Sequence, residues 1–285
     1  MEAAKRLVRK VRDKYQPLSR FSAEYGALSR ILEMRDIFAL AKATVIQSPA
    51  ILRTKKLTAL DASMSRNMTV RFGDSLMVMP LADVDRMLVN DNPTFGNVRE
   101  IYARNCYLEH LKLKKPVSTV LDLGANRGMF SLLALLALDA EIAVGVEPMV
   151  VYDSVHQLLL KANGCDPLRA PRYWKFITSP SAERLDSSQN VSIETILREQ
   201  KIDRFRLVKM DIEGHEKAVF SEPEWLAHVD NITMELHPHF VDDLSLIPKA
   251  LDRYGFKWRI FDQAGNIVEI QKGMFLCASR AGELA

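Results

Sequence analysis

The segment Thr119–Ser131 constrains the fold of this chain more than any other part of the sequence. It reads Thr-Val-Leu-Asp-Leu-Gly-Ala-Asn-Arg-Gly-Met-Phe-Ser, so that an apolar run ends in Asp122 and a tight turn follows. The turn holds Gly124, Asn126 and Gly128. The apolar residues after it predict a helix over 128–138. A strand, a glycine-bearing turn and a helix form the opening unit of nucleotide-binding α/β folds, where the main chain bends sharply and a ligand lies against it.

The spacing within the turn indicates which ligand this unit binds. It is Asp-x-Gly-x-Asn-x-Gly, and it lacks the third glycine that dinucleotide-binding folds place in Gly-x-Gly-x-x-Gly. The pattern therefore points away from a dinucleotide and towards S-adenosylmethionine. The residues expected to contact this donor are Asp122, Gly124, Ala125, Asn126 and Gly128. For Asp122, the alternative is a structural role in which its carboxylate caps the N–H groups of the turn.

Two further donor contacts are expected at the ends of the next strands. Glu147 follows the second predicted strand, 147 − 122 = 25 positions after Asp122, where a carboxylate can accept two hydrogen bonds from a ribose diol. A solvated acid at a strand end is the alternative, but the apolar strand before Glu147 and Pro148 after it favour a fixed position. Ser179 follows the third strand and could reach the adenine, although serine is common in loops for other reasons.

Strands and helices alternate from residue 117 to the C-terminus. The predicted strands cover 118–123, 142–147, 172–177, 205–211, 231–237, 256–262 and 273–278. The predicted helices cover 128–138, 151–163, 192–200, 214–220 and 244–254. Repeated strand–helix units predict a mostly parallel sheet with helices on both faces, and the C-terminal hairpin adds an antiparallel edge. In such α/β sheets, ligands bind beyond the carboxyl ends of the strands.

Residues 1–115 form a different region, which we expect to be mainly helical. Arg30–Lys42 has helical spacing, with Pro49 beyond its end, and Val98–Leu113 is a second predicted helix. Around Gly73-Asp74, a β-hairpin is predicted at about 68–80. The Lys114-Lys115-Pro116 sequence marks the boundary to a second domain over 116–285. We expect the first region to help to cover the acceptor site, because a site at strand ends needs a cover from outside the sheet.

Composition narrows the class of protein. The net charge of +3 over 285 residues is too small to indicate nucleic-acid binding, and the longest apolar run is about half of the ~20 residues that a membrane span needs. Three widely spaced cysteines and the lack of an apolar signal-peptide core favour a reducing cytoplasm. Residues 1–15 are rich in Lys and Arg and could form a weakly amphipathic helix at an anionic membrane, although a solvated helix face is the alternative.

Polar side chains concentrate at the ends of the fourth and fifth predicted strands. They are Lys209, Asp211, Glu235 and His237. Side chains alternate along a strand, so these four line one side of the sheet if the two strands are neighbours. Because Lys and Glu within apolar strands need partners, we expect a Lys209–Glu235 ion pair. Asp211 and His237 then face the substrate; the alternative is a network that only orders the sheet edge. His215 and His239 are expected to be surface residues.

These segments together closely resemble the FkbM family of S-adenosylmethionine-dependent methyltransferases. The resemblance rests on Val120–Ser131, Val146–Pro148, Val191–Leu197, Val208–Glu216 and Met234–Pro238, which occur in the family's order. It covers roughly residues 117–278, and the Lys-x-Asp-x-Glu-Gly-x-Glu block with Glu-Leu-His is its most specific part. The resemblance implies a seven-stranded Rossmann-like class I sheet, S-adenosylmethionine as the donor and usually a hydroxyl acceptor on a sugar, glycan or natural product.

The expected mechanism follows from the donor, whose sulfonium-bound methyl group is already electrophilic. The protein aligns the reactants and places a base that takes the acceptor proton. Our candidates for this base are Asp211 and His237, with Glu235 orienting one of them. We expect no metal, because Lys209 would compete for Glu235, although these three side chains are suitable ligands. The alternatives are a nicotinamide-dependent oxidoreductase and a non-catalytic module tethered by its basic N-terminus; the acceptor and the oligomeric state stay open.

Overall fold

The computed structural model describes residues 24–89, 91–238 and 244–285, and the chain divides into two compact units. Unit 1 comprises Met1–Asn105 and unit 2 comprises Cys106–Ala285. The sequence placed the boundary at residue 116, whereas the structure divides after Asn105, a residue with a left-handed φ of 49°. Tyr107 therefore belongs to unit 2, where it reaches the site described below. The basic segment 1–15 and His239 lie outside the described residues.

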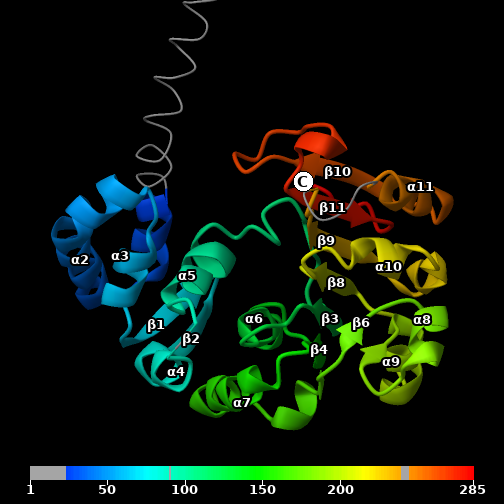
Figure 1. The fold of residues 1–285 in the computed structure, drawn as a ribbon, viewed down its shortest axis with the longest axis horizontal. Helices are drawn as coiled ribbons and strands as arrows, with labels where there is room; N and C mark the ends of the chain where they lie inside the picture. The colour runs from blue at the N-terminus through cyan, green and yellow to red at the C-terminus, as the bar shows by residue number, and fades with distance from the viewer. Residues whose placement is uncertain (1–23, 90, 239–243) are drawn as a thin grey trace, which may run out of the picture. The chain divides into compact units, whose positions relative to one another are not determined.

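Unit 1 combines helices with one β-hairpin (Figure 1). Residues 24–31 are helical, and the elements that follow are α2 (Met34–Thr54), α3 (Thr58–Ser63), β1 (Asn67–Phe72), β2 (Ser75–Pro80), α4 (Leu81–Met87), α5 (Phe95–Asn97) and the π-helix η1 (Val98–Ala103). β1 and β2 pair antiparallel around Gly73, at the position that the sequence predicted for a hairpin. The side chain of Arg99 is mostly buried and forms ion pairs with Glu24 and Asp61.

Helix α2 continues well past the predicted end at Lys42, and Pro49 lies inside it. A proline within a helix removes the hydrogen bond to the carbonyl four residues earlier, here that of Val45. The hydroxyl of Ser48 donates to this carbonyl at 2.8 Å and replaces the missing donor. The prediction was wrong because this local replacement lets the helix continue through the proline.

The helix predicted over Val98–Leu113 is also shorter in the structure. It ends at Ala103, and the chain turns at Asn105. Residues 106–110 form turns, and Leu111 makes an isolated antiparallel bridge to Leu284 near the C-terminus. The apolar side chains that suggested a helix are buried, but the residues that carry them lie in a loop.

Unit 2 is built around a seven-stranded, mostly parallel sheet with the strand order β10-β11-β9-β8-β3-β4-β5. The strands are β3 (Thr119–Leu123), β4 (Ile142–Val146), β5 (Arg172–Tyr173), β8 (Leu207–Met210), β9 (Asn231–Glu235), β10 (Lys257–Phe261) and β11 (Phe275–Ser279). β11 pairs antiparallel with both β9 and β10. The predicted fold class is confirmed. The chain first builds outward from β3 to β5 and then returns to add β8 on the other side, so the switch point lies between β3 and β8.

Helices cover both faces of this sheet (Figure 1). They are α6 (Met129–Ala137) and α7 (Asp153–Ala162) on one side, and α8 (Pro180–Leu185), α9 (Ile193–Gln200), α10 (Glu216–Phe220) and α11 (Leu246–Arg253) on the other. Short 3-10 helices lie at Val150–Tyr152, Pro167–Arg169, Pro223–His228 and Ile270–Lys272. Leu121, Val208 and Ile232 belong to the apolar core that includes α9 and α10 residues, whereas Asp122 and Lys209 point to the α6 side.

The third predicted strand, 172–177, is split in the structure. Its first half is β5, and its second half, β6 (Phe176–Ile177), pairs with β7 (Asn190–Val191) in a separate two-stranded sheet. The main-chain N–H groups of Phe176 and Thr178 donate to Gln189 and Val191 rather than to β4. This break carries the chain away from the main sheet before Ser179.

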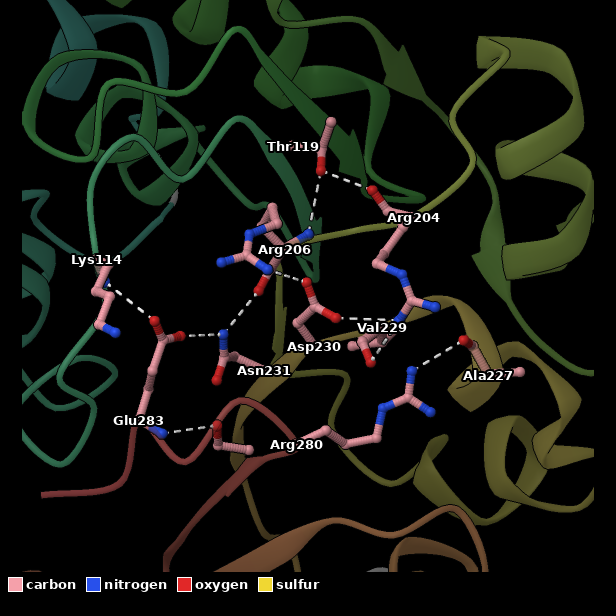
Figure 2. Close-up of polar contacts among 11 residues, drawn as sticks. Lys114, Thr119, Arg204, Arg206, Ala227, Val229, Asp230, Asn231, Arg280 and Glu283 are labelled. Atoms are coloured by element: carbon pink, nitrogen blue, oxygen red, sulfur yellow. Dashed lines mark hydrogen bonds and ion pairs between the residues drawn. The ribbon is translucent and has the colours of Figure 1, made fainter.

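The amino ends of the central strands are held by a polar network (Figure 2). Asp230, just before β9, accepts from Arg204 at 3.0 Å and also pairs with Arg206. Glu283 is buried near the C-terminus and accepts from the side chain of Asn231 at 2.8 Å. These contacts lie at the end of the strands opposite to their carboxyl ends. They tie the C-terminal segment to the amino ends of β8 and β9 and do not occupy the carboxyl ends, where a ligand can bind.

Candidate active site

The turn after β3 is shaped by two glycines that tolerate no side chain. Gly124 has a φ of 72°, and a Cβ on it would lie 1.7 Å from the carbonyl oxygen of Asp211. Gly128 has a φ of 83°, precedes α6, and a Cβ on it would lie 2.1 Å from Nδ1 of His156. Left-handed backbone is strained for other residues, and here the space is occupied as well. The sequence pattern around these glycines therefore reflects a main chain packed on both sides.

Glu147 lies directly after β4 and is tied to this turn. Its carboxylate accepts from the main-chain N–H of Asn126 at 2.9 Å and from that of Met149 at 2.9 Å. The side chain is almost fully buried, so its position is fixed, as the sequence predicted for a strand end followed by proline. Its role as the ribose ligand stays a prediction, and so do the donor contacts of Ala125, Asn126 and the two glycines.

The partly buried Arg172 and the buried His156 lie against the same turn. Arg172 of β5 donates to the carbonyl of Asn126 at 2.6 Å. His156 of α7 lies 3.2 Å from the carbonyl of Ala170 through Nε2. Burial, with the charge of Arg172 nearby, lowers the pKa of His156 to about 4. His156 is therefore neutral at physiological pH, which suits its place beside a guanidinium group.

Lys209 has a different partner from the one predicted. Its ammonium lies 3.2 Å from Oδ1 of Asp122 and donates to the carbonyl of Gly124 at 2.8 Å. Burial lowers the pKa of Lys209, but the carboxylates of Asp122 and Asp211 outweigh burial and raise it, so the amine stays charged. The prediction of a Lys209–Glu235 ion pair was wrong, because β3 lies beside β8 and offers Asp122 at the same level of the sheet.

Asp122 is fully buried below the turn. Its other carboxylate oxygen accepts from the hydroxyl of Ser131 in α6 at 2.7 Å. Asp122 thus joins the strand, the turn and the first helix, with Lys209 as its counter-ion. This role is structural, but the partners are the Ser131 hydroxyl and Lys209 rather than the N–H groups of the turn that the sequence alternative named. Direct contact of Asp122 with the donor stays a prediction.

The predicted neighbours Asp211, Glu235 and His237 come together at the carboxyl ends of β8 and β9. Lys209 pairs in register with Thr233, which places Asp211 and Glu235 side by side just beyond it. One ligand-type atom from each of Asp211, Glu235 and His237 lies within 4.8 Å of the others. His237 Nε2 faces Asp211 Oδ1 at 3.6 Å. The alternation of side chains predicted a shared face if β8 and β9 were neighbours, and the structure shows that they are.

Two more side chains complete this group, and sequence reasoning assigned no role to either. Glu216, at the start of α10, is fully buried and lies 2.7 Å from Nδ1 of His237. Tyr107 donates its hydroxyl to Oδ2 of Asp211 at 2.8 Å. We call Tyr107, Asp211, Glu216, Glu235 and His237 the rim cluster. The acid at a helix start was a usable signal for Glu216, whereas Tyr107 lies in a loop that the sequence predicted as helix.

The carboxylates of the rim cluster set the protonation of His237. Burial lowers the pKa of His237, but the hydrogen bond to Glu216 and the charges of Glu216, Asp211 and Glu235 together outweigh burial and raise it. The buried Glu216 fixes the ring through Nδ1, so Nε2 is the nitrogen on the Asp211 side. A histidine oriented by a buried carboxylate is the arrangement of a general base.

The rim cluster could also hold a divalent ion. Two carboxylates and an imidazole within 4.8 Å are suitable ligands for several divalent metals. The sequence argument against a metal rested on competition from Lys209 for Glu235, and that competition does not occur. The expectation that no metal binds here stays a prediction.

The remaining candidates lie outside this group. Ser179 is buried and caps α8, accepting from the N–H of Ala182 at 3.4 Å, so its predicted contact with adenine stays a prediction. His215 stacks on Phe176, with ring centroids 5.5 Å apart.

Residues 122–258 match the family model of the methyltransferase FkbM domain. The match identifies this part, just under half of the chain, as similar to the FkbM methyltransferase family. The matched residues include the turn after β3, Glu147 and four of the five residues of the rim cluster. The FkbM domain is a methyltransferase domain, and S-adenosylmethionine is its methyl donor.

Similar solved structures include two other methyltransferases. The first is methyltransferase FkbM from Methylobacillus flagellatus KT, with 15% identity, 70% of this chain and 60% of that chain covered, and a TM-score of 0.43. The second is magnesium protoporphyrin IX methyltransferase from Synechocystis PCC 6803 with bound SAM, with 13% identity, 58% and 71% covered, and a TM-score of 0.38. The match thus spans less than two thirds of the Methylobacillus chain.

No curated protein matches the sequence of the chain. Among the residues that the structure describes, no helix is both long enough and apolar enough to cross a membrane.

Proposed function

We propose that this FkbM domain methylates a hydroxyl oxygen of a small-molecule or glycan acceptor, with His237 as the general base. The observation that carries the proposal is the position of His237, held by the buried Glu216 and facing Asp211 beside the turn after β3. A hydroxyl is a weak nucleophile, so its methylation needs a base, whereas many softer acceptors do not. The imidazole of His237 in its neutral form, oriented by a buried carboxylate at the carboxyl ends of β8 and β9, supplies one.

The residues after β3 and β4 would hold the donor. Gly124 leaves no room for a side chain between the turn and β8, and such a turn lets a ligand lie against main chain. Glu147 would accept hydrogen bonds from the ribose, since each carboxylate oxygen can accept more than one. When bound, S-adenosylmethionine supplies an electrophilic methyl group, so that an O–C bond forms as the S–C bond breaks and the thioether product leaves.

The rim cluster would accept the proton of the acceptor hydroxyl. Neutral His237 takes the acceptor proton on Nε2 as the O–C bond forms, and Glu216 stabilises the resulting imidazolium through Nδ1. Asp211 and Glu235 position the acceptor and favour the cationic form of His237. Lys209 acts indirectly, because its ammonium holds the carbonyl of Gly124 and so fixes the donor turn.

The acceptor class follows from the resemblance and from charge. We propose a sugar, a glycan or a natural product that carries a hydroxyl, and no nucleic acid, since the net charge is only +3. A cytoplasmic location and a covering role of residues 1–115 at the acceptor site stay predictions, and the sequence sets no oligomeric state.

Donor binding is the first test. Isothermal titration calorimetry would measure the Kd of S-adenosylmethionine and of NADH for the wild type, for Glu147→Ala and for Glu141→Ala, an exposed acid before β4. We expect the sulfonium donor to bind, with at least tenfold weaker binding in Glu147→Ala only, because two charge-assisted hydrogen bonds are lost. Binding of NADH instead would indicate the oxidoreductase, and binding of neither would indicate a non-catalytic module.

Catalysis is tested by formation of S-adenosylhomocysteine with a panel of sugars, nucleotide sugars and hydroxylated lactones. We expect His237→Gln to lower kcat by about 10²- to 10⁴-fold with an unchanged donor Kd. Exposed His228 serves as the control position for the same substitution. Activity should survive a chelator; loss that Mg²⁺ or Mn²⁺ restores would contradict His237 as the base and make the rim cluster a metal site.

A further inference from the structure

Helix α2 presents apolar side chains on two opposite faces. One face is buried in unit 1 through the apolar residues Leu40 and Ala43, together with the acid Asp36. The other carries Met34, Phe38, Val45 and Leu52, whose exposed fractions are 65%, 68%, 74% and 66%. We call these four residues the α2 stripe. A helix with large apolar residues on both faces usually has a partner on each, and the described residues of unit 1 provide none for the α2 stripe.

The spacing of the α2 stripe makes it continuous. The four residues are separated by four, seven and seven positions, and at ~100° per residue they fall within about 40° of one another. They run almost from one end to the other of a 21-residue helix, about 30 Å long. The hydrogen bond from Ser48 to Val45 keeps the stripe unbroken past Pro49. The result is a long, narrow apolar surface rather than scattered exposed residues.

At the amino end of α2 the exposed Glu33 pairs with Arg35, and the other exposed charged side chains of α2 and of the two residues after it are cationic. Lys42, Arg53, Lys55 and Lys56 are all exposed, and within the described residues none of them forms an ion pair. The acid of α2, Asp36, is fully buried on the opposite face and pairs with Arg66 at 3.2 Å. The exposed side of α2 therefore combines large apolar residues with uncompensated positive charge.

This charge distribution selects among the partners that could cover the stripe. In a second copy of the chain, two such helices would bring their cations together with no exposed acid on α2 to pair them. The segment 1–23 would be repelled as well. It carries Lys5, Arg6, Arg9, Lys10, Arg12, Lys14 and Arg20 against Glu2 and Asp13. An anionic surface attracts both regions.

We propose that the α2 stripe docks onto an anionic lipid membrane. The helix would lie in the plane of the interface with the stripe in the acyl boundary, while Lys42 and the lysines after Arg53 reach the head groups. This inference does not depend on the proposed reaction, because unit 1 carries it alone. If it is correct, an enzyme that the sequence predicts to be cytoplasmic also binds to a membrane surface through unit 1.

Co-sedimentation of the full-length protein with lipid vesicles tests the proposal. The vesicles are phosphatidylcholine alone and phosphatidylcholine with phosphatidylglycerol. We expect binding to the anionic vesicles, decreasing with salt. Phe38→Glu and Val45→Glu should each lower the partition coefficient by about tenfold or more, since each removes a large apolar contact and adds a repelled charge. Leu185→Glu, in unit 2 at a side chain 89% exposed, should have no effect.

The cationic contribution is measured with Lys42→Gln and Arg53→Gln. Each should lower binding to anionic vesicles by about fivefold and leave binding to neutral vesicles unchanged. Thermal melting and donor binding verify that every variant is folded. Equal binding to neutral and anionic vesicles, or no binding to either, would overturn the proposal. So would a dimer, detected by analytical ultracentrifugation, that Phe38→Glu dissociates, because the partner would then be a second copy.

Discussion

The two halves of the candidate site are built in different ways. On the donor side, the turn after β3 is defined by its main chain. Gly124 packs against the carbonyl of Asp211, and the main-chain N–H of Asn126 donates to the carboxylate of Glu147. On the acceptor side, the rim cluster is defined by side chains, with three carboxylates around His237. Close packing of the main chain determines the donor side, and the charges of side chains determine the acceptor side.

This difference explains what each half tolerates. A main-chain site fails when any atom is added, because the neighbouring backbone cannot move aside. A charged site keeps its shape when one carboxylate becomes an amide, and it changes in protonation and rate instead. Substitutions on the donor side should therefore act on stability and donor binding, and those on the acceptor side on kcat and its pH dependence.

The largest effect is expected for Gly124→Ala. A Cβ here would lie 1.7 Å from a backbone oxygen, so β8 or the turn must shift. We expect a loss of about 4 kcal/mol or more of unfolding free energy, together with loss of donor binding. Gly164→Ala is the matched control, since Gly164 has a φ of 65° but nothing near its Cβ, and it should cost only about 1 kcal/mol. Equal losses in chemical denaturation would show that backbone strain, not the contact with Asp211, requires glycine.

Lys209→Met changes a residue that lies between the donor turn and the rim cluster. It removes the counter-ion of the fully buried Asp122 and the donor to the carbonyl of Gly124. Breaking a buried ion pair costs about 3–5 kcal/mol, and we expect this range in urea unfolding. Exposed Lys217→Met is the control, and adding Asp122→Asn should recover part of the loss. If the double variant were no more stable than the single one, the charge of Asp122 would not be the cause.

The fold was largely predictable because its determinants are local. Apolar runs and strand-end acids located β3, β4, β8 and β9, and the side-chain period predicted which residues of each strand share a face. The failures have particular causes. Ser48 replaces the hydrogen-bond donor that Pro49 lacks, and the strand at 172–177 splits because Phe176 pairs with a strand that comes later in the sequence.

The site was predictable to a smaller extent, and the half that depends on charge was the harder one. The order of strands decides that Lys209 meets Asp122 instead of Glu235, and strand order is not a local property of the sequence. Tyr107 reaches Asp211 from a loop more than a hundred positions earlier in the sequence. Spacing along the chain could group Asp211, Glu235 and His237, but it could not supply the residues that hold them.

Glu216→Gln should change the pH dependence of the reaction. The pKa of His237 is raised in the wild type, so kcat/KM should fall as the pH drops through this raised value and His237 becomes protonated. Removing the Glu216 charge should lower this pKa and move the acid limb to lower pH. At the alkaline plateau, kcat should fall by about tenfold, as one charge-assisted hydrogen bond is lost. The pH profile of S-adenosylhomocysteine formation measures both. An unchanged acid limb would mean that another group is the base.

The smallest effect is expected for Tyr107→Phe, which removes one hydroxyl and keeps the ring. The ring packs edge-on against Phe130 and Phe275 and lies beneath the ammonium of Lys209, so the packing is retained. The lost hydrogen bond to Asp211 should lower kcat by about three- to tenfold, with little change in donor Kd. Tyr25→Phe, in unit 1, is the control. Asp211 lies against the donor turn through its carbonyl and in the rim cluster through its carboxylate. If Tyr107→Phe instead raised the donor Kd and left kcat unchanged, the Asp211 carboxylate would belong to the donor side. The donor side would then depend on charge as well as on main-chain packing.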